Sequence, residues 1–174
     1  MPTRKVKEMS RSTPLPKRNS ESAARKVVDA LCGFGLFGVE FFVRGDQAIF
    51  SELSPRPHDT GMVTLISQFP NEFELHLRAV LELPIPSIEF AGPSASAVIL
   101  AERESDGLSY EVEGVAEALA LGCPGSPVDL RIFAKPRALK NRRMGVALAR
   151  DMSVEDAVER AKAAAARVGI RYSD

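Results

Sequence analysis

Two consecutive segments of the sequence have the alternating pattern of β-strands, and a short polar segment separates them. Apolar side chains occupy every second position of residues 37–43, which is the period of a half-buried strand. Residues 44–47, Arg-Gly-Asp-Gln, have the composition of a turn, and residues 48–53 predict the returning strand. The chain is therefore expected to contain a β-hairpin.

Each predicted strand carries one glutamate, Glu40 or Glu52. If the hairpin turns about Asp46, the two side chains lie directly opposite each other on one face, about 5 Å apart. Like charges so placed repel, and burial among phenylalanines would add a desolvation cost. Either one carboxyl stays protonated or a divalent cation such as Mg²⁺ lies between them, completed by water and phosphate. A register shifted by one residue would instead send them to opposite faces.

The segment at residues 51–61 contains Glu52 and continues into a loop with several kinds of polar side chain. Ser54, Arg56, His58 and Asp59 supply a hydroxyl, a guanidinium, an imidazole and a carboxylate, and two prolines stiffen the segment. Arg56 could hold an anion through two hydrogen bonds. The alternative is an exposed proline-rich turn with solvated charges. No Ser/His/Asp or Cys/His set is evident, so no protein nucleophile is expected.

A second polar segment, residues 135–143, is strongly basic and lies between two predicted strands. Such a cluster could hold a phosphate ester, although a solvated hairpin tip would have the same composition. Its positive residues are Lys135, Arg137, Lys140, Arg142 and Arg143.

Helices are predicted on both sides of the hairpin. Residues 20–32 have helical spacing, with Ser20 as the cap and Gly33 as the stop. Asn71 and Glu74 form a capping box for a second helix. We expect that helix to bury its apolar residues, which are Phe73, Leu77, Val80 and Leu81.

Residues 84–93 contain three prolines and a glycine, which indicates a domain boundary. Beyond it, strands are predicted at residues 95–101, 130–134 and 146–149, followed by a helix that opens at Ser153 and ends at Gly169. The expected fold class is α+β, with mixed α/β elements. The predicted parts are a disordered basic tail (1–20), a first domain (21–90) and a second domain (91–174).

Composition argues against several classes of function. Net charge is zero over 174 residues, so no overall field attracts nucleic acid or a membrane. No apolar run approaches the ~20 residues of a membrane span, and the N-terminus lacks the apolar stretch of a signal peptide. Cys32 and Cys123 have no metal-type spacing. We expect a cytoplasmic protein with reduced thiols, which binds neither nucleic acid nor membrane.

Two motifs resemble a known enzyme family. Residues 35–43 (GLFGVEFFV) and 51–61 (SELSPRPHDTG) are similar to the end of an ATP-grasp domain, in which glutamates on adjacent strands hold Mg·ATP. Ser54 stands where many relatives have Asn. This serine, residues 58–64 (HDTGMVT) and the KP…RRMGVA pattern at residues 135–147 resemble the formate-dependent phosphoribosylglycinamide formyltransferase family. The resemblance extends from about residue 22 to residue 170.

The resemblance implies the carboxy-terminal half of an ATP-grasp domain, followed by a small mixed β domain that resembles the rudiment single hybrid motif. It implies an enzyme of purine biosynthesis that uses ATP and Mg²⁺ to convert formate to formyl phosphate, and then transfers the formyl group to glycinamide ribonucleotide. Such catalysis needs no protein nucleophile. Glu40 and Glu52 would bind magnesium, and Ser54, Arg56 and His58 would support the site. The ribonucleotide would contact Asp59, Lys135, Arg142 and Arg143, the last three near its phosphate.

Members of this family are more than twice as long as this chain. We therefore expect little turnover from the isolated chain, an exposed apolar surface, and either a homodimer or association with a missing amino-terminal portion. One alternative is a non-catalytic module that binds nucleotide or a partner. Another is a different ATP-grasp enzyme, such as carboxyaminoimidazole ribonucleotide synthase, which Ser54 and the His58-Asp59 pair disfavour.

Overall fold

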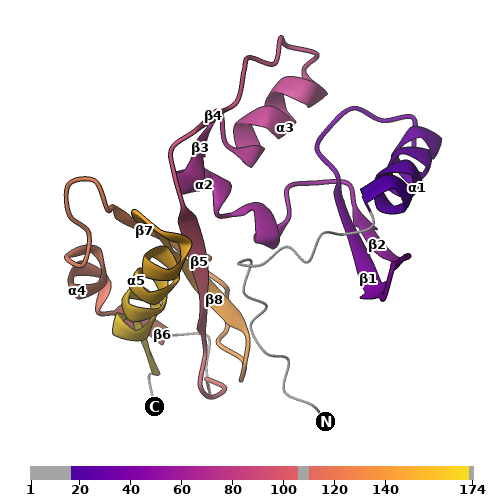
Figure 1. Ribbon diagram of the computed structural model, residues 1–174. Helices are drawn as coiled ribbons and strands as arrows, with labels where there is room; N and C mark the ends of the chain where they lie inside the picture. The colour runs from indigo at the N-terminus through magenta and orange to yellow at the C-terminus, as the bar shows by residue number, and fades with distance from the viewer. Residues whose placement is uncertain (1–16, 106–109, 173–174) are drawn as a thin grey trace. The chain divides into compact units, whose positions relative to one another are not determined.

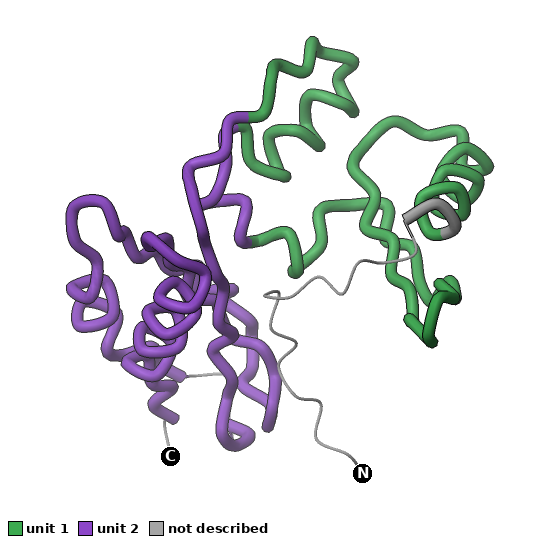
Figure 2. The backbone as a smooth tube through the Cα atoms, in the orientation of Figure 1, with its two compact units in different colours: residues 1–62, 70–88 green, residues 63–69, 89–174 purple. Residues whose placement is uncertain are grey.

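The computed structural model describes residues 17–105 and 110–172, and the chain divides into two compact units. Unit 1 comprises Met1–Met62 and Pro70–Ile88, and unit 2 comprises Val63–Phe69 and Glu89–Asp174 (Figure 2). The chain passes from unit 1 to unit 2 for the last time between residues 88 and 89, which lie within the proline-rich segment at residues 84–93. Helices and strands are both present in quantity, which confirms the α+β class (Figure 1).

The first helix, α1 (Lys17–Ala30), begins earlier than predicted. Ser20 lies inside the helix and is not its cap, because Lys17 and Arg18 have high helix propensity and extend the helix backwards. The disordered tail predicted for residues 1–20 therefore overlaps the helix at residues 17–20. Residues 1–16 lie outside the described residues. At the other end Cys32, with φ of 49°, adopts the left-handed conformation predicted for Gly33.

Unit 1 continues with the predicted hairpin, formed by β1 (Gly38–Arg44) and β2 (Gln47–Ser54). The loop after β2 includes a 3₁₀ turn (Asp59–Gly61) and leads to α2 (Thr64–Ser67) in unit 2. Two short strands, β3 (Gln68–Phe69) and β4 (Glu89–Phe90), pair there.

Helix α3 (Glu72–Val80) has the predicted cap, but its predicted burial was wrong. The Asn71 side chain accepts hydrogen bonds from the amides of Phe73 and Glu74, at 3.0 and 3.1 Å. The buried residues of α3 are Glu72 and Leu75. The residues predicted to be buried are between 44% and 56% exposed, because nothing in the described part of unit 1 covers their face; they are Phe73, Leu77, Val80 and Leu81.

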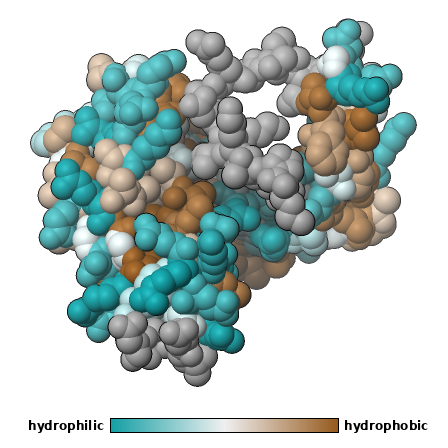
Figure 3. Space-filling model, turned by 90° about the horizontal axis from the view of Figure 1, so that it is seen from below, coloured by the Kyte–Doolittle hydropathy of each residue, from teal (hydrophilic) through white to brown (hydrophobic). Residues whose placement is uncertain are grey.

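The exposed apolar surface extends well beyond α3. Among the described residues of unit 1, Leu75 and Pro70 are the two buried apolar side chains. Hydrophobic residues accordingly reach the molecular surface in Figure 3. The predicted exposure of apolar surface is therefore confirmed, and self-association through it stays a prediction. The other large exposed side chains of unit 1 are Leu31, Phe34, Phe42, Val43, Ile49, Phe50, Leu83, Ile85 and Ile88.

Unit 2 has a conventional core under a three-stranded antiparallel sheet. Its strands β5 (Ser94–Leu100), β8 (Arg143–Arg150) and β7 (Val128–Ile132) lie in the order β5-β8-β7. Alternate residues of β5 are buried, and residues 144–149 of the central strand are all buried. The three predicted strands are confirmed, although β7 begins and ends two residues earlier than predicted and β8 begins before its predicted start at residue 146.

Helix α5 (Val154–Arg167) packs against this sheet (Figure 1). The Ser153 hydroxyl accepts a hydrogen bond from the Asp156 amide at 3.0 Å, which confirms the predicted cap. The helix buries Ala157, Ala161 and Ala164, whose small side chains permit close approach to the strands.

Two shorter elements complete unit 2. Strand β9 (Gly169–Tyr172) follows α5 and pairs with β6 (Tyr110–Glu113), and β6 leads into α4 (Val115–Leu119). Gly169, predicted to end α5, is the first residue of β9 instead. In the described ranges, 17–105 and 110–172, no helix has the length and apolar character needed to cross a membrane.

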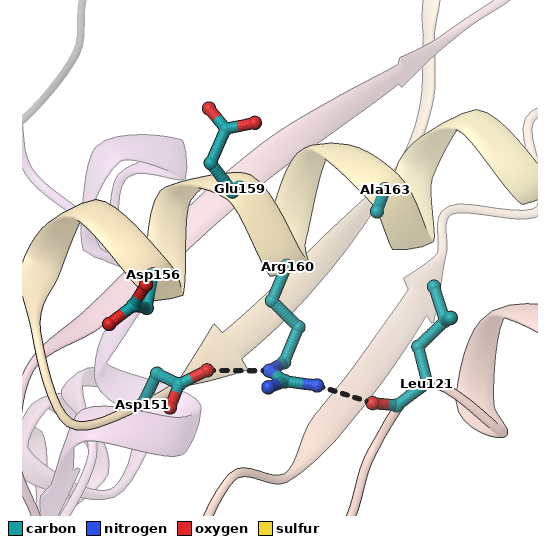
Figure 4. A pocket seen from close by; sticks show the side chains of 6 residues that line it. All are labelled: Leu121, Asp151, Asp156, Glu159, Arg160 and Ala163. Atoms are coloured by element: carbon teal, nitrogen blue, oxygen red, sulfur yellow. Dashed lines mark hydrogen bonds and ion pairs between the residues drawn. The ribbon is translucent and has the colours of Figure 1, made fainter.

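An ion pair joins α5 to the end of β8 (Figure 4). Arg160 donates from Nε to Asp151 at 2.7 Å and from Nη1 to the Leu121 carbonyl at 2.7 Å. Asp151 also accepts hydrogen bonds from the Ser126 hydroxyl and the Met152 amide. These bonds, with the Arg160 guanidinium first, lower the pKa of Asp151 below its ordinary value of 3.8.

Replacing Asp151 with asparagine should destabilise unit 2 in a pH-dependent way. A lowered carboxyl pKa stabilises the folded state above pH 3.8, and this stabilisation is lost as the pH falls through the lowered pKa. Asp151→Asn should therefore melt at a lower temperature than wild type at pH 7, with a difference that shrinks below pH 3.8. Melting curves followed by circular dichroism test this, with the exposed Glu102→Gln as control. An unchanged difference at pH 3 would contradict it.

Candidate functional site

Glu40 and Glu52 lie directly opposite each other on the hairpin, as predicted. The register of the two strands differs, however, from the predicted one. Arg44 pairs with Gln47, so the turn is centred between Gly45 and Asp46, and an unbroken ladder would place Glu40 opposite Ser51. A β-bulge between the Phe41–Phe50 and Glu40–Glu52 pairs adds one residue on β2 and restores the opposition.

Both carboxylates are exposed, so the predicted burial among phenylalanines was wrong. The Glu40 side chain is 49% exposed, and water screens its repulsion from Glu52. The buried Ser54 hydroxyl donates to Glu52 at 3.4 Å. Among residues 17–105 and 110–172, no group of three or more His, Cys, Asp or Glu side chains is arranged to hold a metal. A cation between Glu40 and Glu52 would therefore need further oxygen ligands from phosphate or water.

The loop after β2 lies against the hairpin through His58. Its Nε2 is 3.2 Å from a Glu40 oxygen, and its Nδ1 is 3.2 Å from an Asp59 oxygen and 3.0 Å from the Thr60 hydroxyl. Gly38 permits this approach, since a side chain there would meet the Cβ of His58 at 3.1 Å. Glu40, His58 and Asp59 thus form one connected polar cluster. Arg56 is exposed and donates to the Pro57 carbonyl at 3.0 Å.

Two residues of α3 support this cluster and were missed in the sequence. Glu72, only 4% exposed, accepts a hydrogen bond from the His58 amide at 3.3 Å. Burial raises its pKa above 4.5, and the amide and charge of His58 partly offset this effect. His76 accepts from the Leu36 amide at 2.9 Å. In the sequence Glu72 resembles an ordinary acidic residue of a first helical turn, so no local signal identifies it.

The basic segment of unit 2 has a tightly bonded backbone. Two non-glycine residues with left-handed conformation, Ala134 and Asn141, lie near its ends, with φ of 47° and 63°. The Tyr110 hydroxyl donates to the Lys135 carbonyl at 2.5 Å. The buried Ser105 donates to the Ala138 carbonyl from its amide at 3.0 Å and its hydroxyl at 3.3 Å. The loop is thereby ordered before any ligand binds.

The cations of this loop differ in their surroundings. Arg137 is 3.3 Å from the Glu104 carboxylate, which balances its charge. Lys135 lies over the Phe133 ring, 5.8 Å from its centroid, and Arg142 donates to the Arg137 carbonyl at 3.1 Å. Lys135 and Arg142 thus lie in one short loop, and the exposed Arg143 follows as the first residue of β8. The charge of this segment suits a phosphate.

Comparison with protein families gives two matches. Residues 4–73 match the ATP-grasp domain, and residues 94–168 match the family described as PurT, C-terminal. The first match begins at residue 4, earlier than the start near residue 22 suggested by the motifs.

The chain is also similar to formate-dependent phosphoribosylglycinamide formyltransferases. It is 63% identical over 155 residues to that of Synechococcus elongatus, covering 88% of this chain and 38% of the relative. It is 56% identical over 155 residues to that of Shewanella frigidimarina, covering 88% and 37% respectively. The chain thus spans less than two fifths of the length of these curated relatives.

Solved structures share the fold. N5-carboxyaminoimidazole ribonucleotide synthetase from Thermotoga maritima is 31% identical with a TM-score of 0.74, covering 91% of this chain and 43% of that one. Glycinamide-RNase-transformylase T from Mycobacterium tuberculosis is 34% identical with a TM-score of 0.63, covering 86% and 40%. The chain therefore matches the ATP-grasp domain over residues 4–73 and shares its fold with these solved structures. Its sequence is similar to part of the formate-dependent phosphoribosylglycinamide formyltransferases, and residues 94–168 match the family described as PurT, C-terminal.

Adding a methyl group at Gly61 should destabilise unit 1. A Cβ there would lie 2.0 Å from Oε2 of Glu72 and 2.6 Å from its carboxyl carbon, so the loop or the carboxylate must move. Gly61→Ala should lower the free energy of unfolding by about 1–3 kcal/mol, as overpacking does. Urea denaturation would measure it, with Gly33→Ala as control because its neighbours are no closer than 3.8 Å. Equal stability of the two variants would contradict the close contact.

Proposed function

We propose that this chain supplies the magnesium-binding and phosphate-binding carboxy-terminal part of an ATP-dependent formyltransferase of de novo purine biosynthesis. The enzyme would activate formate as formyl phosphate, with release of ADP, and transfer the formyl group to the amine of glycinamide ribonucleotide. The opposition of Glu40 and Glu52 on one hairpin carries this proposal. The high identity to formyltransferases supports the choice of reaction.

Glu40 and Glu52 would hold Mg²⁺ between them. Their exposed oxygen ligands fit this ion, which commonly takes one or two carboxylates and binds nucleotide phosphate with the rest of its shell. The bound ion would neutralise charge on the transferring phosphoryl group. Ser54 would orient Glu52 through its hydrogen bond, and His58 would orient Glu40.

Four residues are proposed to contact the ribonucleotide. Asp59 would accept a hydrogen bond from it, and Lys135, Arg142 and Arg143 would bind its phosphate. Arg56, with its exposed guanidinium, would add a contact to an anionic group. None of these residues acts as a nucleophile. Their contribution is positioning and electrostatic stabilisation, which supply most of the rate in phosphoryl transfer.

Further parts of the site would come from outside the matched region. The curated relatives are more than twice as long, and their amino-terminal portion, on the same polypeptide or a separate one, would complete the nucleotide cleft. Contact with that portion, or with a second copy of this chain, would cover the exposed apolar side chains of unit 1.

One observation favours a second candidate, an N5-carboxyaminoimidazole ribonucleotide synthetase. The structure of that enzyme from Thermotoga maritima has the higher TM-score of the two solved structures described above. Its 31% identity is, however, half of the 63% shared with the cyanobacterial formyltransferase. Measuring which substrate, formate or bicarbonate, supports ADP release would separate the two candidates.

Glu52→Gln should abolish magnesium-dependent ADP release. ADP would be measured with ATP, formate and glycinamide ribonucleotide, using the chain together with a separately produced amino-terminal portion of a formyltransferase. Removing one of two carboxylates halves the protein ligands of the ion, so the rate should fall by at least about 100-fold, as for loss of a strong electrostatic contact. Asp46→Asn, in the exposed hairpin turn, is the matched control.

Two outcomes would contradict the proposal. Release that persists at the wild-type rate in Glu52→Gln would exclude the metal role of Glu52. Complete absence of ADP formation from the wild-type chain with the added portion would leave a non-catalytic module that binds nucleotide or a partner.

Arg142→Ala should weaken binding of glycinamide ribonucleotide far more than Arg137→Ala. Both residues lie in the basic loop, but Glu104 balances the charge of Arg137. Losing a charge-assisted contact to phosphate should lower the affinity for the ribonucleotide by about 10- to 100-fold. Isothermal titration calorimetry with the ribonucleotide and with inorganic phosphate would measure it. Equal losses in both variants would indicate a general charge effect and no specific phosphate site.

A further inference from the structure

We propose that Glu72 is a positioning residue that fixes the loop bearing His58 and Asp59 against the hairpin. It would act through the backbone of His58 and so set the direction of the Asp59 carboxylate. Its effect on ribonucleotide binding rests on the function proposed above, whereas its effect on the loop rests on the contacts alone.

The first evidence is where the carboxylate of Glu72 lies. The residue is 4% exposed, and Oε2 accepts the hydrogen bond of the His58 amide at 3.3 Å. The same oxygen lies 2.0 Å from the position that a Cβ of Gly61 would occupy. The carboxylate therefore occupies the space of a side chain at residue 61. It contacts the loop at both ends of the short turn that contains Asp59.

The second evidence is that α3 contacts the chain on both sides of the hairpin. Glu72 and His76 are four residues apart and therefore lie on the same helical face. Glu72 binds the loop after β2, and His76 accepts from the Leu36 amide just before β1. The Asn71 cap and the buried Leu75 hold this end of the helix in place. Helix α3 thus joins the entry and the exit of the hairpin.

The third evidence is energetic. Burying a carboxylate is costly unless hydrogen bonds compensate, and the burial of Glu72 raises its pKa. A residue in the first turn of an exposed helix could remain solvated at no such cost. The bond to the His58 amide compensates part of the cost, and it ties α3 to the loop.

Substitutions of Glu72 can distinguish whether the loop needs a hydrogen-bond acceptor at this position or a negative charge. Glutamine keeps the length of the side chain and one acceptor oxygen, so Glu72→Gln should preserve the contact. Aspartate keeps the charge but is one methylene shorter, so Glu72→Asp should lose it. Glu74→Ala is the matched control, because Glu74 lies on the same helix and pairs with Arg78 within it.

Amide hydrogen exchange of the chain, read at His58 and Gly61, tests the effect on the loop. Exchange at these amides should be about tenfold faster in Glu72→Asp and Glu72→Ala, as loss of one hydrogen bond predicts, and close to wild type in Glu72→Gln and Glu74→Ala. Exchange at the Leu75 amide, which bonds to Asn71 within α3, reports whether the helix remains folded. Wild-type exchange at His58 in Glu72→Asp would overturn the proposal, as would equal acceleration at His58 in Glu72→Gln.

Titration with glycinamide ribonucleotide then tests the consequence for binding. Glu72→Asp should weaken the affinity about tenfold, and Glu72→Gln should restore it. A wild-type chain that binds no ribonucleotide would count against the proposed function, while the exchange data would still decide the role of Glu72. Unchanged affinity in a Glu72→Asp variant whose loop exchanges faster would overturn the link between loop position and substrate.

Discussion

The pairing of Glu40 with Glu52 is the interaction on which the candidate site depends, and an irregularity in the hairpin produces it. Without the bulge on β2, the register set by the turn would place Glu40 opposite Ser51. Two unit charges about 5 Å apart repel by roughly 1 kcal/mol in water, a cost that an exposed hairpin can bear. The same exposure leaves both carboxylates accessible to a cation. The positive charge of the cation would attract both carboxylates and offset their mutual repulsion.

The two units differ in how much apolar surface they bury. In unit 2 the central strand β8 and the alanine face of α5 pack together in a buried core. Within the described part of unit 1, Glu72 and His76 accept hydrogen bonds from the amides of His58 and Leu36, which connect α3 to the segments on either side of the hairpin. Each large apolar side chain left exposed forgoes about 1.5–3 kcal/mol of burial energy. A surface that covered this face would therefore stabilise unit 1 together with its hairpin.

The sequence predicted the features that depend on neighbouring residues. The Asn71 and Ser153 caps and the strands of unit 2 follow from local patterns, and the structure confirms them. The burial of Leu77 was wrongly predicted, because helical periodicity identifies the face that needs cover and not whether cover is present. The bulge was missed since no residue type specifies it.

Glu72 and Tyr110 were missed for a related reason. Each acts on the backbone of a loop distant in sequence, at His58 or Lys135, and such a contact leaves no pattern in the residues around it. Both candidate loops are thus held in part by hydrogen bonds from or to distant side chains at a backbone amide or carbonyl. Phosphoryl transfer depends on groups already in position when charge develops, because reorganisation at that moment would cost rate. Backbone contacts of this kind would meet this requirement, since they fix the position of a loop without using the side chains of Glu72 or Tyr110 as ligands.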